Sequence, residues 1–204
     1  MRRIVLLGFA LFILSGCGRY FIPLEGKLEN GAIQALRPLS SDSPKIAVFL
    51  EKYWDRRIVS QKANGATCGH GYTEIPLGPA LSQEIIQGLG ILFPAVKVVD
   101  RPERPDDFFL VQIDATNLEI RFEFSAWGGC DPPWIDQARI SVALRARITN
   151  LENQSILDRT YYYEEKEVDH EIPPVSHTGV MEKCLHKAAV KFVKELREAI
   201  KPLS

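Results

Sequence analysis

Hydrophobic and polar residues alternate along three long stretches of the chain, and this pattern predicts β-strands. The clearest stretch is 135–149, and a five-residue loop at 150–154 joins it to a second alternating stretch at 156–168. The two stretches are predicted to pair as an antiparallel hairpin. The third stretch, 108–124, changes parity near Thr116-Asn117. This change predicts either a β-bulge or two shorter strands.

Two other stretches repeat apolar residues every three or four positions, which is the spacing of an amphipathic helix. The first helix is expected over 79–93, because proline suits the first helical turn and Pro94 ends the pattern. The second helix is expected over 176–200. Short apolar runs at 45–50 and 96–99 predict two further strands.

The order of these elements indicates the fold class. Consecutive strands with short links favour an antiparallel meander, and both helices can bury their apolar stripes against one face of it. The sequence therefore predicts an α+β fold, a two-layer sandwich in which a mostly antiparallel sheet of about five strands carries two helices packed on one face. Residues 51–78 are rich in glycine and charge and are expected to form a long loop. A loop of this length in a compact domain is usually functional or mobile.

The N-terminal segment has a different pattern. Met1-Arg2-Arg3 is followed by an apolar run and then by Leu14-Ser15-Gly16-Cys17. A basic start, a short apolar region and small residues are typical of a signal peptide. The apolar run from Ile4 to Gly16 is thirteen residues long, whereas a transmembrane helix needs about 20. A plain secretory signal is the main alternative, but it would not need a cysteine at position 17.

This layout resembles the signal peptide of bacterial lipoproteins, with Leu14-Ser15-Gly16-Cys17 at the place of the lipobox. The resemblance implies cleavage before Cys17 and acylation of Cys17, and more than one acyl chain gives stable anchoring. The expected organisation is a signal peptide at 1–16, a lipidated N-terminus and tether at 17–44, and a single α+β domain at 45–204. Because Gly18 rather than aspartate follows Cys17, the resemblance favours the outer membrane, with the domain facing the periplasm.

The composition beyond the leader is that of an ordinary globular domain. The whole chain is 46% hydrophobic and 25% charged, which suffices for a core. Without Arg2 and Arg3 the formal net charge changes from −1 to −3. This charge argues against a nucleic-acid partner, which would require a basic face.

Three cysteines remain besides Cys17. Cys68 and Cys130 lie in glycine-rich segments, and the envelope is oxidising, so by elimination we predict that they form a disulfide. Unpaired thiols or a metal site are the alternatives. Zinc sites usually need about four ligands with paired spacing, and neither CxxC nor HxxxH occurs. We therefore expect no metal, and no cofactor besides the covalent lipid. Cys184 lies on the apolar face of the last helix and is expected to be a buried free thiol.

No motif indicates an enzyme. The sequence has no Gly-x-Ser-x-Gly elbow, and its four histidines are expected in loops or, for His186, on a polar helix face. Trp54, Trp127 and Trp134 are the candidates for partner binding, since tryptophans anchor interfaces and also lie at membrane headgroups. The alternative is that these rings cap the open end of the core.

The anchor and the element order together resemble a loose group of small Gram-negative envelope lipoproteins. The group includes the auxiliary lipoproteins of ABC-type lipid transport systems and YajG-like lipoproteins, and more distantly those of lipopolysaccharide assembly and curli secretion. The resemblance implies a lipid-anchored, non-enzymatic assembly or transport accessory that contacts an envelope protein complex or lipid through 51–78 and 125–134. A periplasmic lipid or glycan binder is the alternative, and an envelope enzyme is the third possibility.

Overall fold

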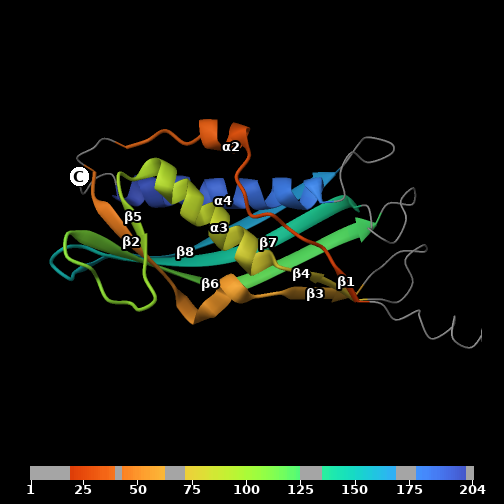
Figure 1. Ribbon diagram of the computed structural model, residues 1–204, viewed down its shortest axis with the longest axis horizontal. Coiled ribbons are helices and arrows are strands. Elements are labelled where there is room, and N and C mark those ends of the chain that lie inside the picture. The colour runs from red at the N-terminus through yellow and green to blue at the C-terminus, as the bar shows by residue number, and fades with distance from the viewer. Residues whose placement is uncertain (1–18, 40–42, 63–71, 125–134, 169–177, 201–204) are drawn as a thin grey trace, which may run out of the picture.

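The computed structural model describes residues 19–39, 43–62, 72–124, 135–168 and 178–200 (Figure 1). A five-stranded sheet with the strand order β5-β2-β6-β7-β8 forms one layer. Its strands are β2 (Lys45–Leu50), β5 (Val96–Val98), β6 (Phe108–Phe124), β7 (Ile135–Thr149) and β8 (Ser155–Val168). Strands β6, β7 and β8 form the predicted antiparallel meander, whereas β2 pairs in parallel with both β5 and β6.

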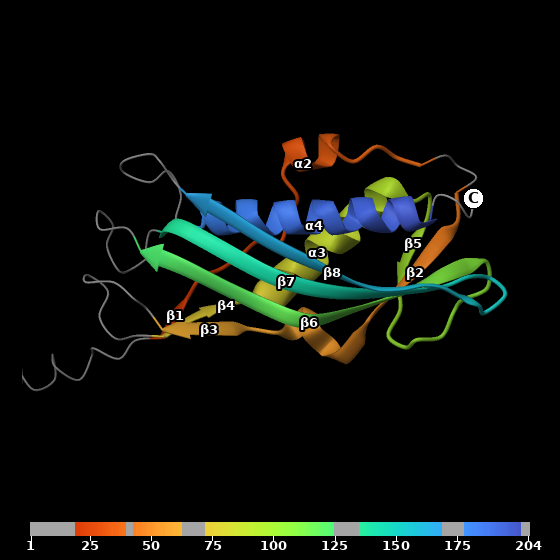
Figure 2. The same cartoon turned by 180° about the vertical axis from the view of Figure 1, so that it is seen from behind.

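Two helices, α3 (Leu77–Leu92) and α4 (Gly179–Ile200), cover the same face of this sheet (Figures 1 and 2). The predicted two-layer α+β architecture is therefore confirmed. The stripe of α4 that faces the sheet consists of side chains without solvent exposure: Met181, Cys184, Leu185, Ala188, Phe192 and Leu196. The rings of Tyr161 and Tyr163 on β8 meet the Phe192 ring edge-on.

Helix α3 begins at Leu77, two residues before the predicted start at Pro79. The early start is possible because the first backbone N–H groups of a helix have no partner within the helix, so proline is tolerated throughout the first turn. Gly78 allows the helix start to approach the preceding segment closely. A Cβ atom at this position would lie 2.1 Å from the backbone oxygen of Trp54.

The predicted irregularity in the third strand is a β-bulge. Ala115 pairs with Leu144 and Asn117 pairs with Ala143, so Thr116 is the extra residue. The Thr116 hydroxyl donates a hydrogen bond to the carbonyl oxygen of Ala143 at 3.3 Å. Strand β6 continues through the bulge, which excludes the alternative of two shorter strands.

The expected long loop at 51–78 is wrong in the part that is described. Residues Glu51–Arg56 form a 3-10 helix (η2), and Val59–Lys62 (β3) and Tyr72–Ile75 (β4) are antiparallel strands. They join β1 (Arg19–Phe21) in a second sheet with the order β1-β4-β3. Strands of three or four residues are too short to show a clear alternation in the sequence.

Residues 19–39 differ from the expected tether, because they pack on the domain. After β1, this N-terminal arm runs over the helices and includes a short helix, α2 (Asn30–Gln34) (Figure 1). Four of its side chains are buried in the common core: Ile22, Leu24, Leu28 and Leu36. Apolar burial is the main source of folding free energy, so the folded unit extends to the start of β1.

Candidate functional site: the anchor end and the N-terminal arm

Most of the predicted site residues lie outside the described residues. These are Cys17, Cys68, Cys130, Trp127 and Trp134. The lipidation of Cys17, the Cys68–Cys130 disulfide and the binding role of the two tryptophans therefore stay predictions.

Trp54 is described, and its side chain belongs to the core. The residue is 3% exposed, and its indole Nε1 donates a hydrogen bond to the backbone oxygen of Ile113 at 3.0 Å. A buried indole whose N–H is satisfied in this way offers no surface to a partner. The neighbouring Tyr53 is exposed instead, and Arg56 stacks on its ring at 5.0 Å from the centroid.

One end of the molecule gathers the start of β1 and the ends of several other strands. Tyr72 pairs with Arg19 on one side and with Lys62 on the other. Phe124 of β6 pairs with Ile135 of β7, and the C-terminal end of β8 lies beside them (Figures 1 and 2). We call this the anchor end, because Arg19 follows Cys17, the predicted lipidation site, by two residues.

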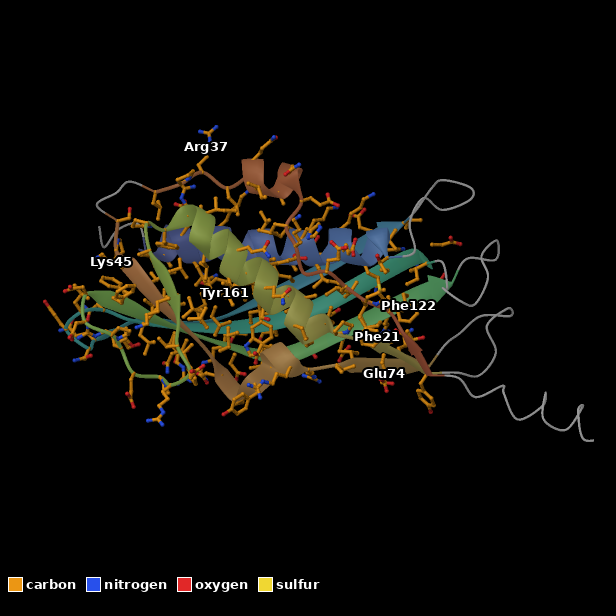
Figure 3. All side chains as sticks on the ribbon, viewed as in Figure 1. Phe21, Arg37, Lys45, Glu74, Phe122 and Tyr161 are labelled. Atoms are coloured by element: carbon orange, nitrogen blue, oxygen red, sulfur yellow. The ribbon has the colours of Figure 1, made fainter. Side chains whose placement is uncertain are left out.

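The three-stranded sheet has a buried face and an exposed face at the anchor end. Thr73 and Ile75 of β4 have no solvent exposure, whereas Tyr72 and Glu74, which alternate with them, point outward. On the outer face, Tyr72 is 55% exposed and Phe21 is 58% exposed. Figure 3 shows Phe21 close to Glu74, its register partner on β4, at this end of the molecule. We call Phe21 and Tyr72 the aromatic face.

The N-terminal arm is fixed to α3 by a pair of amide hydrogen bonds. The backbone N–H of Leu28 donates to Oε1 of Gln87, and Nε2 of Gln87 donates to the backbone oxygen of Gly26, both at 3.1 Å. Gly26 has a φ of +61°, and a Cβ atom there would lie 2.7 Å from Cα of Ala80. The arm therefore needs glycine at position 26 both for its backbone angle and for its close approach to α3.

A buried ionic pair lies beneath the arm. Glu84 of α3 has no solvent exposure, and its Oε1 lies 2.9 Å from Nδ1 of His186 on α4. Neither carboxylate oxygen of Glu84 makes a well-directed hydrogen bond, and the contact is an ion pair when His186 is protonated and Glu84 is ionised. On the other side of the imidazole ring, Nε2 lies 3.7 Å from Oε1 of Glu29 in the arm. His186 thus connects α3, α4 and the arm.

Burial and mutual attraction both shift the pKa values of Glu84 and His186. Burial raises the pKa of the Glu84 carboxyl above its ordinary value, and contact with His186 offsets only part of this effect. Burial alone would lower the pKa of His186, but its contact with Glu84 and the nearby charges of Glu29 and Glu182 raise it. The sequence pattern predicts His186 on a polar helix face, whereas in the structure the residue is only 7% exposed. Glu84, a charge within the apolar stripe of α3, was the signal that could have revealed a buried ionisable group on this helix, although not its partner.

The arm and α4 enclose two surface pockets that share Glu29 and His186. One, of about 370 Å³, is lined mostly by polar residues, including Glu25, Glu29 and Glu182. The other, of about 360 Å³, has the apolar residues Ala32 and Val190 in its lining. Four lysines line the second pocket: Lys183, Lys187, Lys191 and Lys194.

The described residues offer few groups for bond-making chemistry. In this part of the chain, no three His, Cys, Asp or Glu residues are arranged to hold a metal ion. Cys184 is free and buried, as predicted. Burial raises the pKa of its thiol to about 12, so the thiol stays protonated at neutral pH and is a poor nucleophile. None of the described helices is both long and apolar enough to span a bilayer.

Comparisons with known proteins give distant structural likenesses. No family model matches the sequence, and no curated protein matches it. A Xanthomonas campestris protein of the DUF330 family has a TM-score of 0.48 and 12% identity over 90% of this chain and 96% of its own. A minor lipoprotein from Acinetobacter baumannii has a TM-score of 0.34 and 10% identity over 78% of this chain and 92% of its own. The rare lipoprotein B from Shewanella oneidensis has a TM-score of 0.36 and 8% identity over 60% of this chain and 86% of its own. At these values the likeness carries no argument about function.

Proposed function

We propose that the protein is a lipid-anchored, non-enzymatic envelope lipoprotein that acts as an assembly or transport accessory. The observation that carries the proposal is the position of Leu14-Ser15-Gly16-Cys17, which ends two residues before Arg19, the first residue of β1. A lipid on Cys17 would hold the folded module at the membrane surface. The outer membrane is the proposed location, with the module facing the periplasm.

The docked arm determines how far the module can move from its anchor. A free tether over 17–44 would give a root-mean-square reach of about 30 Å. Because β1 begins at Arg19, the two residues from Cys17 to Arg19 span at most about 7 Å. A partner of the anchor end would therefore be at the membrane, as an envelope protein complex or as lipid.

Two connections that start and finish at the anchor end are the proposed contact segments. Residues 63–71 join β3 to β4 and contain Cys68, and residues 125–134 join β6 to β7 and contain Trp127 and Trp134. Cys130 lies in the second connection, so the predicted disulfide would link the two segments. This arrangement supports a contact role for the two tryptophans.

Metabolic labelling with a palmitate analogue tests the anchor. We expect label on the wild-type chain and on Cys184→Ala, and no label on Cys17→Ala. The Cys184 variant is the matched control because it also removes one thiol but keeps the proposed lipobox. Sucrose-gradient fractionation should place the protein with outer-membrane markers. An unlabelled wild-type chain, or a Cys17→Ala variant that keeps full function in the periplasm, would overturn the proposal.

Affinity purification from detergent-solubilised membranes tests the accessory role. We expect a stoichiometric envelope protein with the wild-type chain and a weaker interaction with Trp127→Ala/Trp134→Ala. Tyr162→Ala is the control, since Tyr162 is an exposed aromatic residue in the middle of β8. Recovery of the lipidated protein without any partner would argue against this role.

A lipid binder is the second candidate function. The pocket between α2 and α4, lined by Ala32, Val190 and four lysines, supports it, because an anionic lipid combines an acyl chain with a phosphate. Lys187 and Lys191 pair with Glu167 and Glu165, so the test uses Lys183 and Lys194. The space between the helices and the sheet, by contrast, is filled by the core. Mass spectrometry of the gently purified protein would detect a bound lipid, and its loss in Lys183→Glu/Lys194→Glu would locate the lipid in this pocket.

A further inference from the structure

We propose that the aromatic face, Phe21 and Tyr72, lies in the headgroup region of the bilayer and fixes the orientation of the module on the membrane. The inference rests on the proposed lipidation of Cys17 and adds a second membrane contact made by the folded protein. Its partner is a lipid surface.

The first argument is position. Phe21 follows Cys17 by four residues, which span at most about 14 Å when extended. Tyr72 is the register partner of Arg19, so it lies level with the first residue of β1. The polar region of a bilayer is roughly 5–7 Å deep on each side. Both aromatic residues are therefore within reach of this layer once Cys17 is inserted.

The second argument is exposure. Phe21 and Tyr72 are each more than half exposed, although neighbouring residues on the opposite face of the same sheet are buried. Phe21 pairs with Glu74 and Arg19 pairs with Tyr72, so the alternation along the strands puts both aromatic residues on one face. A tyrosine ring, which combines an apolar body with a hydroxyl, is favoured at membrane–water interfaces. An exposed phenylalanine ring can bury its apolar surface at the boundary between headgroups and acyl chains.

The short link to the anchor disfavours a protein between this face and the bilayer. Only about 7 Å of chain separates Cys17 from β1, whereas one packed layer of helix or sheet is about 10 Å thick. A partner protein inserted there would have to pull the lipid from the membrane or β1 from β4. Lipid headgroups need no such space.

Photo-crosslinking of the lipidated full-length protein tests the inference. The probe p-benzoylphenylalanine replaces Phe21, Tyr72 or Tyr162 in protein reconstituted into vesicles of phosphatidylethanolamine and radiolabelled phosphatidylglycerol. Tyr162 is the control because it is 79% exposed but lies six residues before the end of β8, about 20 Å along the strand. We expect several-fold more labelled lipid on the protein with the probe at 21 or 72 than at 162.

Equal or absent lipid labelling at the three positions overturns the inference. A discrete protein adduct at 21 and 72 in whole cells, without lipid, also overturns it and assigns the face to a protein. The mass of the N-terminal peptide from the same samples distinguishes a failure of the aromatic contact from a failure of Cys17 lipidation. A lipidated Cys17 with no lipid adduct at 21 or 72 rejects only the aromatic contact, whereas an unmodified Cys17 rejects both. Thermal melting of each labelled variant confirms that it is folded.

Discussion

The imidazole Nδ1 of His186 lies 2.9 Å from the carboxylate Oε1 of Glu84, and this buried pair joins α4 to α3 beneath the N-terminal arm. Removal of one partner leaves the other without compensation. We expect His186→Ala to lower the free energy of unfolding by about 3–5 kcal/mol, which is typical when one member of a buried pair is removed.

Urea denaturation of the purified protein measures this loss. Glu164→Gln is the control, because it breaks a pair with Arg139 in which both side chains are at least half exposed, and surface pairs contribute little. A His186→Ala variant as stable as Glu164→Gln would show that the buried pair does not stabilise the fold.

The same pair predicts how stability depends on pH. The pKa values of Glu84 and His186 are both raised above their ordinary values of 4.5 and 6.5 in the folded protein. The folded state therefore binds more protons than the unfolded state, and its contribution to stability is complete below these ordinary values. As the pH rises through the raised pKa of His186, that contribution is lost, because Glu84 keeps a buried charge without a counter-ion.

Urea midpoints at a series of pH values from about 6 to about 9 test this expectation. The free energy of unfolding should decrease across this range. In Glu84→Gln/His186→Gln, which removes both titrating groups, the decrease should be smaller. An unchanged pH dependence in this variant would assign the effect to other groups.

Gly26→Ala should weaken the docking of the arm. A residue with a side chain at a φ of +61° costs about 1–2 kcal/mol, and the new Cβ would also lie 2.7 Å from the α3 backbone at Ala80. Gly31→Ala is the matched control, since a Cβ there meets no atom within 4 Å and the residue lies in helix α2. Amide hydrogen exchange of residues 22–36 should accelerate in Gly26→Ala alone. Equal protection in both variants would mean that the arm does not depend on glycine at this position.

Deletion of Thr116 should be tolerated. It removes the extra residue of the bulge, so that Ala115 and Asn117 pair with consecutive residues of β7 and the inward positions keep their alternation. Deletion of Glu119 is the control, because it turns Ile120 and Phe122 toward the wrong face. We expect the Thr116 deletion to fold, with a cooperative thermal transition. The Glu119 deletion should lose most of its stability, since exposure of buried apolar residues ranks among the largest single-site effects. Similar damage from both deletions would contradict the assigned bulge.

The elements that the sequence predicted well are those with many repeats of one period. Strands β6, β7 and β8 and helix α4 each show several turns or alternations. The parity change at Thr116 was visible because four alternating apolar positions of β6 precede it and four follow it. Strands β1, β3 and β4 have three or four residues each, and their pairing joins distant segments. The local sequence pattern carries little information about which distant segments pair.

The packing of the arm could have been predicted in part from the sequence. Ile22, Leu24 and Leu28 alternate with exposed residues at 23, 25 and 27, but Pro23 and Gly26 interrupt the pattern and favour a loop interpretation. The burial of Trp54 could not be predicted, because it depends on the close approach of Gly78 and on a carbonyl of β6. The pairing of Glu84 with His186 depends on how α3 crosses α4, which no single segment encodes.

The contact between the arm and α4 has a consequence for the time at which the protein folds. His186 follows Glu29 by 157 residues, so the first and last parts of the domain must both be present before the arm can make its contact with α4. If the chain crosses a membrane from its N-terminus, as we propose, Glu29 leaves the membrane well before its partner on α4. The contact between Glu29 and His186 then forms only after translocation of the whole domain.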